Sequence, residues 1–294
     1  MRASARWAGW LTTAALPALA VAACSIGGAT VAPATGAGRP PPAAPAGRAV
    51  LWAVGDGADG GAAGRAVAAR IAASRFDRLL YLGDVYEHGT AADFRRRYAP
   101  TYGRFAARTA PTPGNHDWRN HATGYDPYWR RALGAPLPHW YTFGAGGWQI
   151  LSLDSEAPHV RGSPQERWLR ARLRGGGTCR IAFWHRPRFS AGTHHGDQRD
   201  MAPLWDDLRG RAVIAIAGHE HDMQRLRPVD GITQFVSGAG GADRYRLRRD
   251  PRLAFGNDTS YGALRLDLRP GVATYAFVSA AGRVLDRGTI RCRR

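Results

Sequence analysis

The segment 80-LYLGDVYEHG-89 decides how the rest of the chain is interpreted. It opens with an apolar run that predicts the end of a buried strand at Leu82, and Gly-Asp follows directly. A buried carboxylate is costly unless charge or hydrogen bonds compensate it. Asp84 therefore predicts a compensating group elsewhere in the chain. The segment also leaves open whether the side chain of Tyr86 or that of Glu87 points in the same direction as Asp84.

Strands and helices are expected to alternate on both sides of this segment. Apolar runs predict buried strands at 50–54, 79–82, 147–155, 179–185 and 212–219. Helical spacing predicts helices at 64–74, 91–105 and 163–173, the second ended by Pro100. From residue 231 the pattern changes to strands with tight turns, at 232–238, 260–268, 273–280 and 283–290. This order predicts an α/β fold whose C-terminal part is mostly β.

Side chains that bind metals follow five of the expected strand ends: Asp56, Asp84, Asn115 with His116, His185, and His219 with His221. Open α/β sheets bind ligands beyond the carboxyl ends of their strands. One such aspartate or histidine is more often structural, but this series predicts a metal site. Carboxylate, amide and imidazole ligands without thiolate suit Zn, Mn or Fe. A pair of such ions would account for Asp84, because a carboxylate that bridges two cations is compensated by their charge.

The pattern GD…GDVY…GNHD…H…GHEH, between Val50 and Ile290, resembles the calcineurin-like metallophosphoesterase superfamily. Within it, the chain is most similar to the bacterial relatives of purple acid phosphatases. The resemblance implies a four-layer αββα sandwich, in which two mixed β-sheets are flanked by helices. It also implies phosphoester hydrolysis at a centre of two divalent or trivalent metal ions. The implied ligands of the first ion are Asp56, Asp84 and His221, and those of the second are Asp84, Asn115, His185 and His219.

The resemblance also assigns the chemistry. A metal-bound hydroxide would attack phosphorus, and His116 would act as general acid on the leaving oxygen, with Asp117 orienting its ring. His194 and His195 follow His185 at nine and ten residues, the spacing of a substrate-binding histidine pair in purple acid phosphatases. We therefore expect them to contact the substrate phosphate, and a loop with two exposed histidines is the alternative.

The first metal position departs from the family pattern. The superfamily usually has Asp-x-His there, but Gly57 and Ala58 follow Asp56. Purple acid phosphatases instead supply a tyrosine three residues after the bridging aspartate, where this chain has Glu87. Either Tyr86, one residue earlier, or Glu87 is the expected ligand, and we favour Tyr86. Asp59 is a weaker candidate, and water is the remaining one.

The N-terminus is expected to direct export. Residues 1–23 combine a basic start with an alanine-rich apolar run, which predicts a signal peptide. The sequence 21-VAAC-24 resembles a lipoprotein cleavage box, in which Cys24 would be lipidated and would hold the protein at a membrane. Ordinary cleavage nearby is the alternative. Residues 24–47, rich in Pro, Ala and Gly, are predicted to be a disordered tether, and residues 48–294 the catalytic domain.

An exported protein can form disulfides, and Cys179 and Cys292 remain to pair once Cys24 is lipidated or removed. The formal charge of +18 comes from arginine without any lysine, which indicates a coding bias. Such a surface attracts anions. No nucleic-acid-binding module is recognisable, so no specific nucleic acid is expected as a partner.

The sequence thus favours an extracytoplasmic phosphatase that acts on small phosphate monoesters. A phosphodiesterase or nucleotide hydrolase that uses the same site is one alternative. The other is a non-catalytic envelope protein that binds phosphate or a polyanion, and its only support is the altered first metal position.

Overall fold

A computed structural model describes residues 38–293 of the chain. The predicted signal peptide, Cys24 and most of the predicted tether lie outside these residues. None of the helices in the described part has both the length and the apolar character that a membrane span requires.

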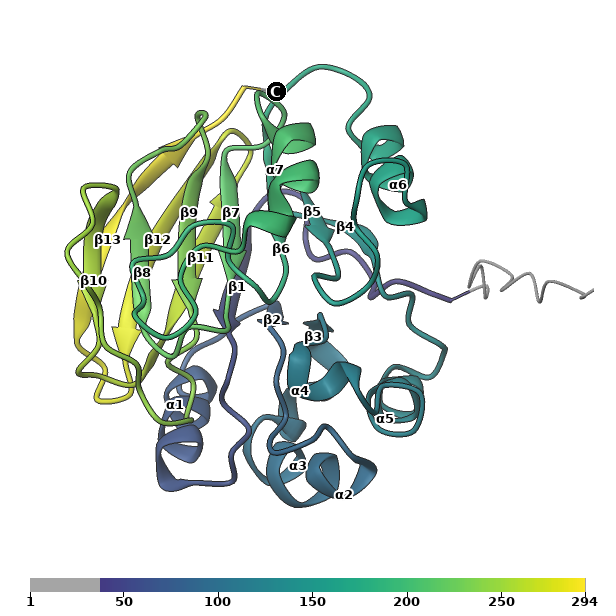
Figure 1. Ribbon diagram of the computed structural model, residues 1–294, viewed down its shortest axis with the longest axis vertical. Helices are drawn as coiled ribbons and strands as arrows, with labels where there is room; N and C mark the ends of the chain where they lie inside the picture. Colours follow the sequence, from purple (N-terminus) through teal and green to yellow (C-terminus); the bar gives the residue numbers. More distant parts are fainter. Residues whose placement is uncertain (1–37, 294) are drawn as a thin grey trace, which may run out of the picture. The chain divides into compact units, whose positions relative to one another are not determined.

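Two mixed β-sheets form the centre of the fold (Figure 1). The six-stranded sheet has the order β13 (Val284–Arg291), β12 (Val272–Ser279), β11 (Gly262–Arg269), β1 (Ala49–Val54), β2 (Arg78–Tyr81) and β3 (Thr109–Pro111). The seven-stranded sheet has the order β10 (Leu253–Asn257), β8 (Met223–Leu226), β9 (Thr233–Ser237), β7 (Ile214–Ala217), β6 (Arg180–Phe183), β5 (Trp148–Ser152) and β4 (Tyr141–Ala145). Neighbouring strands are parallel from β1 to β3 and among β5, β6, β7 and β9.

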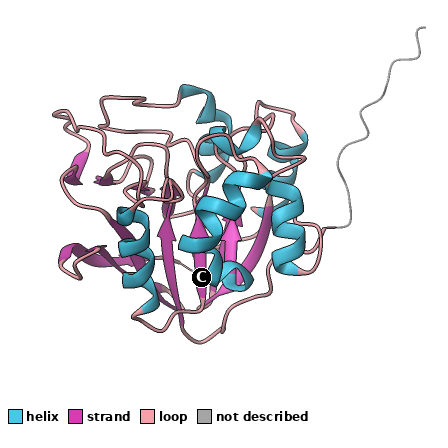
Figure 2. Cartoon of the chain, turned by 90° about the horizontal axis from the view of Figure 1, so that it is seen from below, coloured by secondary structure: helices cyan, strands magenta, loops and turns pink. Residues whose placement is uncertain are grey.

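Alternating side chains of the central strands fill two different cores. In β1, Leu51 and Ala53 lie between the two sheets, whereas Trp52 and Val54 face helices on the other side. The helices of the first sheet include α1 (Ala62–Ala72) and α5 (Tyr125–Leu133); α6 (Pro164–Arg172) and α7 (Ala202–Leu208) cover the second sheet (Figures 1 and 2). Because strand side chains alternate between faces, continuous apolar runs fit strands that are buried on both sides. The predicted four-layer αββα sandwich is confirmed.

The helical segment after β2 differs from its prediction. It runs through α2 (Ala91–Asp93), the π-helical turn η1 (Phe94–Tyr98), α3 (Ala99–Thr101) and the 3₁₀ turn η2 (Gly103–Arg108). Pro100 was expected to end the helix, yet the chain stays helical beyond it. The wider turn before the proline, in which the Ala99 N–H donates to the Phe94 carbonyl, explains how the helix accommodates it. Two further short pieces are α4 (Asn115–Trp118) and the 3₁₀ turn η3 (Arg199–Met201).

The described end of the predicted tether packs on the domain. The Ala44 N–H donates to the Gly144 carbonyl of β4 at 2.8 Å, and the Gly146 N–H donates to the Pro45 carbonyl at 2.7 Å. The Ala44 side chain is buried. Residues 38–47 are therefore a bound edge segment and not a free linker. Their prolines do not prevent this, because a proline carbonyl accepts hydrogen bonds although the ring nitrogen donates none.

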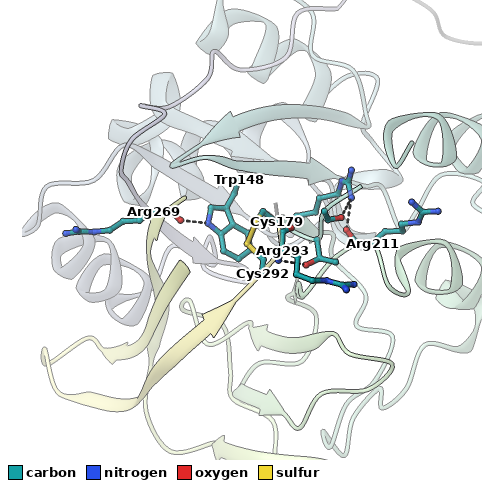
Figure 3. Close-up of a disulfide and its surroundings, with 9 residues drawn as sticks. Trp148, Cys179, Arg211, Arg269, Cys292 and Arg293 are labelled. Carbon is teal, nitrogen blue, oxygen red and sulfur yellow. Dashed lines mark hydrogen bonds between the residues drawn. A yellow bond between two sulfur atoms is a disulfide. The ribbon is translucent and has the colours of Figure 1, made fainter. Parts of the chain in front are cut away.

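The predicted disulfide between Cys179 and Cys292 is confirmed (Figure 3). It joins the C-terminal tail to the beginning of β6, and the two cysteines are 113 residues apart in sequence. Next to it, the Arg293 N–H donates to the Thr178 hydroxyl at 2.9 Å. The tail after β13 is thus held to the seven-stranded sheet by both a covalent bond and a hydrogen bond.

Candidate metal centre

The carboxyl ends of parallel strands from both sheets meet at one place, and the candidate ligands lie there. From the six-stranded sheet, β1, β2 and β3 lead into the segments that carry the aspartates and Asn115; from the seven-stranded sheet, β6 and β7 lead into those that carry the histidines. The His219 N–H donates to Asp56 Oδ2 at 2.9 Å and so connects the two sheets. We call the gathered side chains the strand-end cluster: Asp56, Asp84, Tyr86, Asn115, His185, His219 and His221.

Unusual backbone conformations mark this cluster. Four non-glycine residues of the described chain have a positive φ, and three of them are Asp56 (58°), Asp84 (65°) and His219 (69°). This conformation costs about 1–3 kcal/mol for a side chain other than glycine, and such strain concentrates at functional sites. A Cβ on Gly114 would collide with the Asp84 carboxylate, so only glycine allows the GNHD segment to approach it.

One triangle of polar atoms joins Asp56, Tyr86 and His221, the ligands expected for the first ion apart from the shared Asp84. The Tyr86 hydroxyl lies 3.2 Å from Asp56 Oδ1 and 2.8 Å from His221 Nε2. His221 Nε2 is 3.7 Å from Asp56 Oδ1. The other ring nitrogen of His221, Nδ1, lies 2.5 Å from the Asp243 carbonyl, to which only an N–H can donate. His221 therefore turns an unprotonated Nε2 toward Asp56 and Tyr86.

The structure distinguishes the alternatives at this position by burial. Tyr86 is buried, and its hydroxyl points into the triangle. The Glu87 side chain is 61% exposed and lies outside it. Asp59 accepts the Gly61 N–H at 2.9 Å, just before α1, and has no hydrogen bond to the cluster. Of the three side chains, the structure brings only Tyr86 to the other ligands.

A second group contains the ligands expected for the other ion. His185 Nε2 lies 3.3 Å from Asp84 Oδ2, 3.0 Å from Asn115 Oδ1 and 3.1 Å from His219 Nδ1. His185 Nδ1 donates to the Leu82 carbonyl at 2.7 Å, which directs Nε2 into this group. Asp84, His185 and His219 are buried and each offers a ligand atom within 4.8 Å of the others.

The electrostatics of the cluster favour a bound cation. Burial raises the pKa of Asp56 well above its usual range. Burial also lowers the pKa of His185, but Asp84 and Asp56 outweigh it and the result is about 10. The pKa of His221 falls to about 4, mainly through burial, so its imidazole is neutral as a ligand must be. His185 thus carries a positive charge next to two buried carboxylates, in the position that a bound cation would take over, whereas His221 is neutral. Together with the buried and unpartnered His219 Nε2, these groups fit metal ions at this position.

His116 stands at the open side of the cluster. Its ring is 29% exposed, with Nε2 at 3.9 Å from Asp84 Oδ2. Its Nδ1 lies 2.6 Å from the Glu87 carbonyl, so Nδ1 carries the hydrogen of that bond. This leaves Nε2 as the atom that can exchange a proton beside the cluster.

The predicted contact between Asp117 and the His116 ring is wrong. The Asp117 carboxylate accepts the backbone N–H groups of Gly114, Asp84 and Val85, at 3.0, 2.8 and 3.1 Å. Adjacent residues of a helical turn point in different directions, and Asp117 reaches back over the first turn of α4. Asp117 therefore holds the loop around Asp84, while the Glu87 carbonyl orients His116.

An aromatic wall covers the histidine side of the cluster. His195 stacks on His219 with ring centroids 3.8 Å apart. Tyr245 stacks on His221 at 3.9 Å and on His194 at 4.1 Å. The predicted histidine pair is thus beside the cluster, although both residues are exposed. Tyr245 was not predicted, because its loop carries no motif and is distant in sequence from the other residues.

Glu220, the unassigned residue of the GHEH motif, positions this wall. It is fully buried, and its Oε1 accepts the N–H groups of His195 and Gly196 at 2.9 and 2.5 Å. A glutamate between two candidate ligands, in an otherwise buried strand end, is the signal that could have identified it.

Comparison with known proteins agrees with this geometry. A family model described as calcineurin-like phosphoesterase matches residues 51–223, more than half of the chain. No curated protein matches the sequence. The GAP50 anchor of the inner membrane complex of Plasmodium is similar in structure, with a TM-score of 0.70 and 14% identity over 84% of this chain and 90% of that chain.

Two phosphatases are also similar in structure. A purple acid phosphatase, PPD1 from yellow lupin seeds, has a TM-score of 0.67 and 16% identity over 86% of this chain and 55% of that chain. A dimetal phosphatase from Danio rerio has a TM-score of 0.56 and 14% identity over 82% of this chain and 98% of that chain. Identities this low show a shared fold, whereas the family match covers every residue of the strand-end cluster. The chain belongs to the calcineurin-like phosphoesterase family.

Proposed function

We propose that the protein is an exported phosphatase that hydrolyses small phosphate monoesters with two metal ions in the strand-end cluster. The observation that carries this proposal is that the cluster contains two ligand groups, one around the Asp56 carboxylate and one around the Asp84 carboxylate. Asp56, Asp84, Tyr86 and His221 would hold one ion. Asp84, Asn115, His185 and His219 would hold the other. Fe, Zn and Mn all suit these ligands.

Such ions, when bound, activate water at neutral pH and neutralise the charge that develops on phosphate oxygens. A side chain of the protein supplies the proton that the leaving alcohol requires. His116 presents Nε2 beside Asp84, while its Nδ1–H is fixed by the Glu87 carbonyl. A proton on Nε2 can therefore pass to the oxygen of the departing alcohol, which makes His116 the proposed general acid.

His194, His195 and Tyr245 are the proposed substrate contacts. They form one stacked group with the cluster residues His219 and His221, so a phosphate at the metals would lie beside them. Imidazole and phenol groups can donate hydrogen bonds to a phosphate dianion. A monoester offers more unesterified oxygens to such donors than a diester does, and this supports the choice of monoesters.

Export is proposed from the N-terminal sequence, and lipidation of Cys24 would keep the protein at the cell envelope. The disulfide supports an extracytoplasmic location, because such bonds persist mainly in oxidising compartments. Labelling of Cys24 with a fatty-acid analogue in cells tests the anchor, and a Cys24→Ser variant should lose the label.

The deciding experiment measures metal content, colour and turnover on one sample. We expect about two metal ions in the strand-end cluster, and faster hydrolysis of p-nitrophenyl phosphate than of bis(p-nitrophenyl) phosphate. A visible charge-transfer band that is lost in Tyr86→Phe, and retained in Glu87→Gln, would place a tyrosinate on iron. A clear preference for the diester would overturn the monoester proposal and favour a phosphodiesterase.

A non-catalytic role is the second candidate, and one observation favours it: a protein of similar structure is described as an anchor. Fold alone does not determine function. Absence of turnover after loading with Zn, Mn or Fe, together with tight binding of phosphate or polyphosphate, would support this role and overturn the enzymatic one.

A further inference from the structure

A second group of imidazole and carboxylate side chains can be distinguished from the strand-end cluster. His121 follows α4, Asp126 is in the first turn of α5, and His139 precedes β4. We call these three residues the His121 cluster. It shares no residue with the strand-end cluster and lies outside the motifs that carry the family resemblance.

The three side chains converge on one point. Asp126 Oδ2 lies 3.1 Å from His121 Nδ1, and Asp126 Oδ1 lies 3.0 Å from His139 Nε2. One ligand atom from each residue lies within 4.8 Å of the others. The backbone fixes this approach, because the Asp126 N–H donates to the His121 carbonyl at 2.8 Å. Trp118 supports it by stacking on the His121 ring at 4.3 Å.

A buried carboxylate behind His139 provides independent support. The Asp154 side chain is 0% exposed, and its Oδ2 has no hydrogen-bond partner. This oxygen lies 3.9 Å from His139 Nδ1, the ring nitrogen that faces away from Asp126. Histidines that bind metals usually donate their second N–H to a carboxylate or carbonyl, which orients the ring and makes the coordinating nitrogen more basic.

We propose that the His121 cluster binds a divalent transition-metal ion, with Zn²⁺ the best fit. His121 Nδ1, Asp126 and His139 Nε2 are the ligands, and Asp154 orients His139. Two imidazoles and one carboxylate are a common zinc ligand set, and water completes the tetrahedral coordination. The partial exposure of the three residues, between 19% and 31% of each side chain, gives the ion a path from solvent.

The ion would add a further connection among three segments that their hydrogen bonds already join. It would connect the loop after α4 with the first turn of α5 and with the loop that precedes β4. A metal that binds the folded state alone stabilises it. Because this site shares no ligand with the strand-end cluster, we expect the ion to stabilise the folded domain and to take no part in phosphoester turnover.

A hydrogen-bond network is the competing explanation, in which Asp126 accepts protons from both histidines. The two explanations differ in what zinc does. If the histidines only donate hydrogen bonds to Asp126, added zinc should not bind there. If the group is a metal site, zinc should bind and displace the protons from the ligand atoms.

The test is equilibrium dialysis of the full protein against buffered free Zn²⁺, with zinc per chain measured by mass spectrometry. His121→Gln and His139→Gln should each bind one zinc fewer than the wild type and keep full phosphoesterase activity. Asp154→Asn should keep the site but weaken it by about 10–100-fold, as expected for a carboxylate that orients a ligand. The melting temperature of the wild type should rise with this zinc, and that of His139→Gln should not.

His159→Gln is the matched control. His159 is likewise a histidine close to a carboxylate, with Nε2 3.6 Å from Asp200, but it is more buried and no second histidine completes a ligand group with it in the described chain. Its zinc content should equal that of the wild type. Equal zinc isotherms for the wild type, His121→Gln and His139→Gln would overturn the proposal. A zinc loss of the same size in the His159→Gln control would also overturn it. His121 is the more exposed of the two histidines, so its variant keeps the test valid if His139→Gln unfolds.

Discussion

The strand-end cluster and the His121 cluster are built from the same kinds of side chain in opposite settings. In the first, most ligands are buried, and three of them have a strained positive φ. In the second, the side chains are partly exposed, and they lie on two loops and at the start of a helix, without a positive φ. Backbone strain and buried ionisable groups are concentrated at catalytic sites. The comparison predicts that a substitution affects turnover in the first cluster and stability in the second.

The largest effect is expected for Asp84→Asn. Asp84 contacts the ligand group of His185 and accepts the His116 N–H, so its charge is central to the cluster. Activity should fall by about 10³-fold or more, because metal ions contribute several kcal/mol to such reactions and each 1.36 kcal/mol is tenfold. Zinc in the His121 cluster should remain. Asp267→Asn, at a surface pair with Arg48, serves as control, and full activity of Asp84→Asn would contradict the proposed centre.

His116→Ala separates proton transfer from metal binding. Turnover should fall by about 10²–10⁴-fold, the usual contribution of a general acid, while metal content stays unchanged. The loss should be greater for an alkyl phosphate than for p-nitrophenyl phosphate, because nitrophenolate leaves without protonation. Equal losses for the two substrates would show that His116 has another role.

Glu220→Ala tests the aromatic wall. The substitution removes the acceptor of the His195 and Gly196 N–H groups, so the histidine pair should lose its position. The KM for a monoester should rise about tenfold, since hydrogen bonds to a charged group are worth ~1.5–3 kcal/mol. Glu220→Gln should have a smaller effect, because its amide oxygen can still accept both bonds. A lower kcat at constant KM would instead indicate a role in the chemical step.

The smallest effect on turnover is expected from brief treatment with a chelator. The ligands of the His121 cluster are 19–31% exposed, whereas most ligands of the strand-end cluster are buried, so an ion in the first should exchange faster than ions in the second. A short exposure should therefore remove one metal ion per chain, lower the melting temperature and leave activity unchanged. Parallel loss of metal and activity over time would remove the distinction between the two clusters.

The buried strands and the polar residues at their ends could be predicted because these signals are local. An apolar run shows a strand that is buried on both faces, and the polar residue that follows shows where the strand ends. Two-sheet topology puts these ends together, and the resemblance to a known family supplied that topology. Tyr86 was favoured over Glu87 from the same resemblance, and its buried position agrees with that choice.

Side-chain direction and long-range contacts were not predictable in the same way. Asp117 follows His116 in sequence, but the geometry of a short helix turns its carboxylate to backbone N–H groups instead. Pro100 lies inside a helical segment because a wider turn precedes it. Tyr245 and the His121 cluster depend on loops that only the folded chain brings together. None of these features leaves a periodic pattern in the sequence.

The disulfide between Cys179 and Cys292 has a consequence for handling the protein. It fixes Cys292 next to the start of β6, whereas His185 follows the other end of that strand, six residues after Cys179. At ~3.3 Å per residue, these points are about 20 Å apart. A C-terminal affinity tag, or attachment to a solid support through that end, would therefore leave the entrance to the metal centre accessible. Recombinant production should use an oxidising compartment, so that the disulfide forms and keeps the tagged tail in this position.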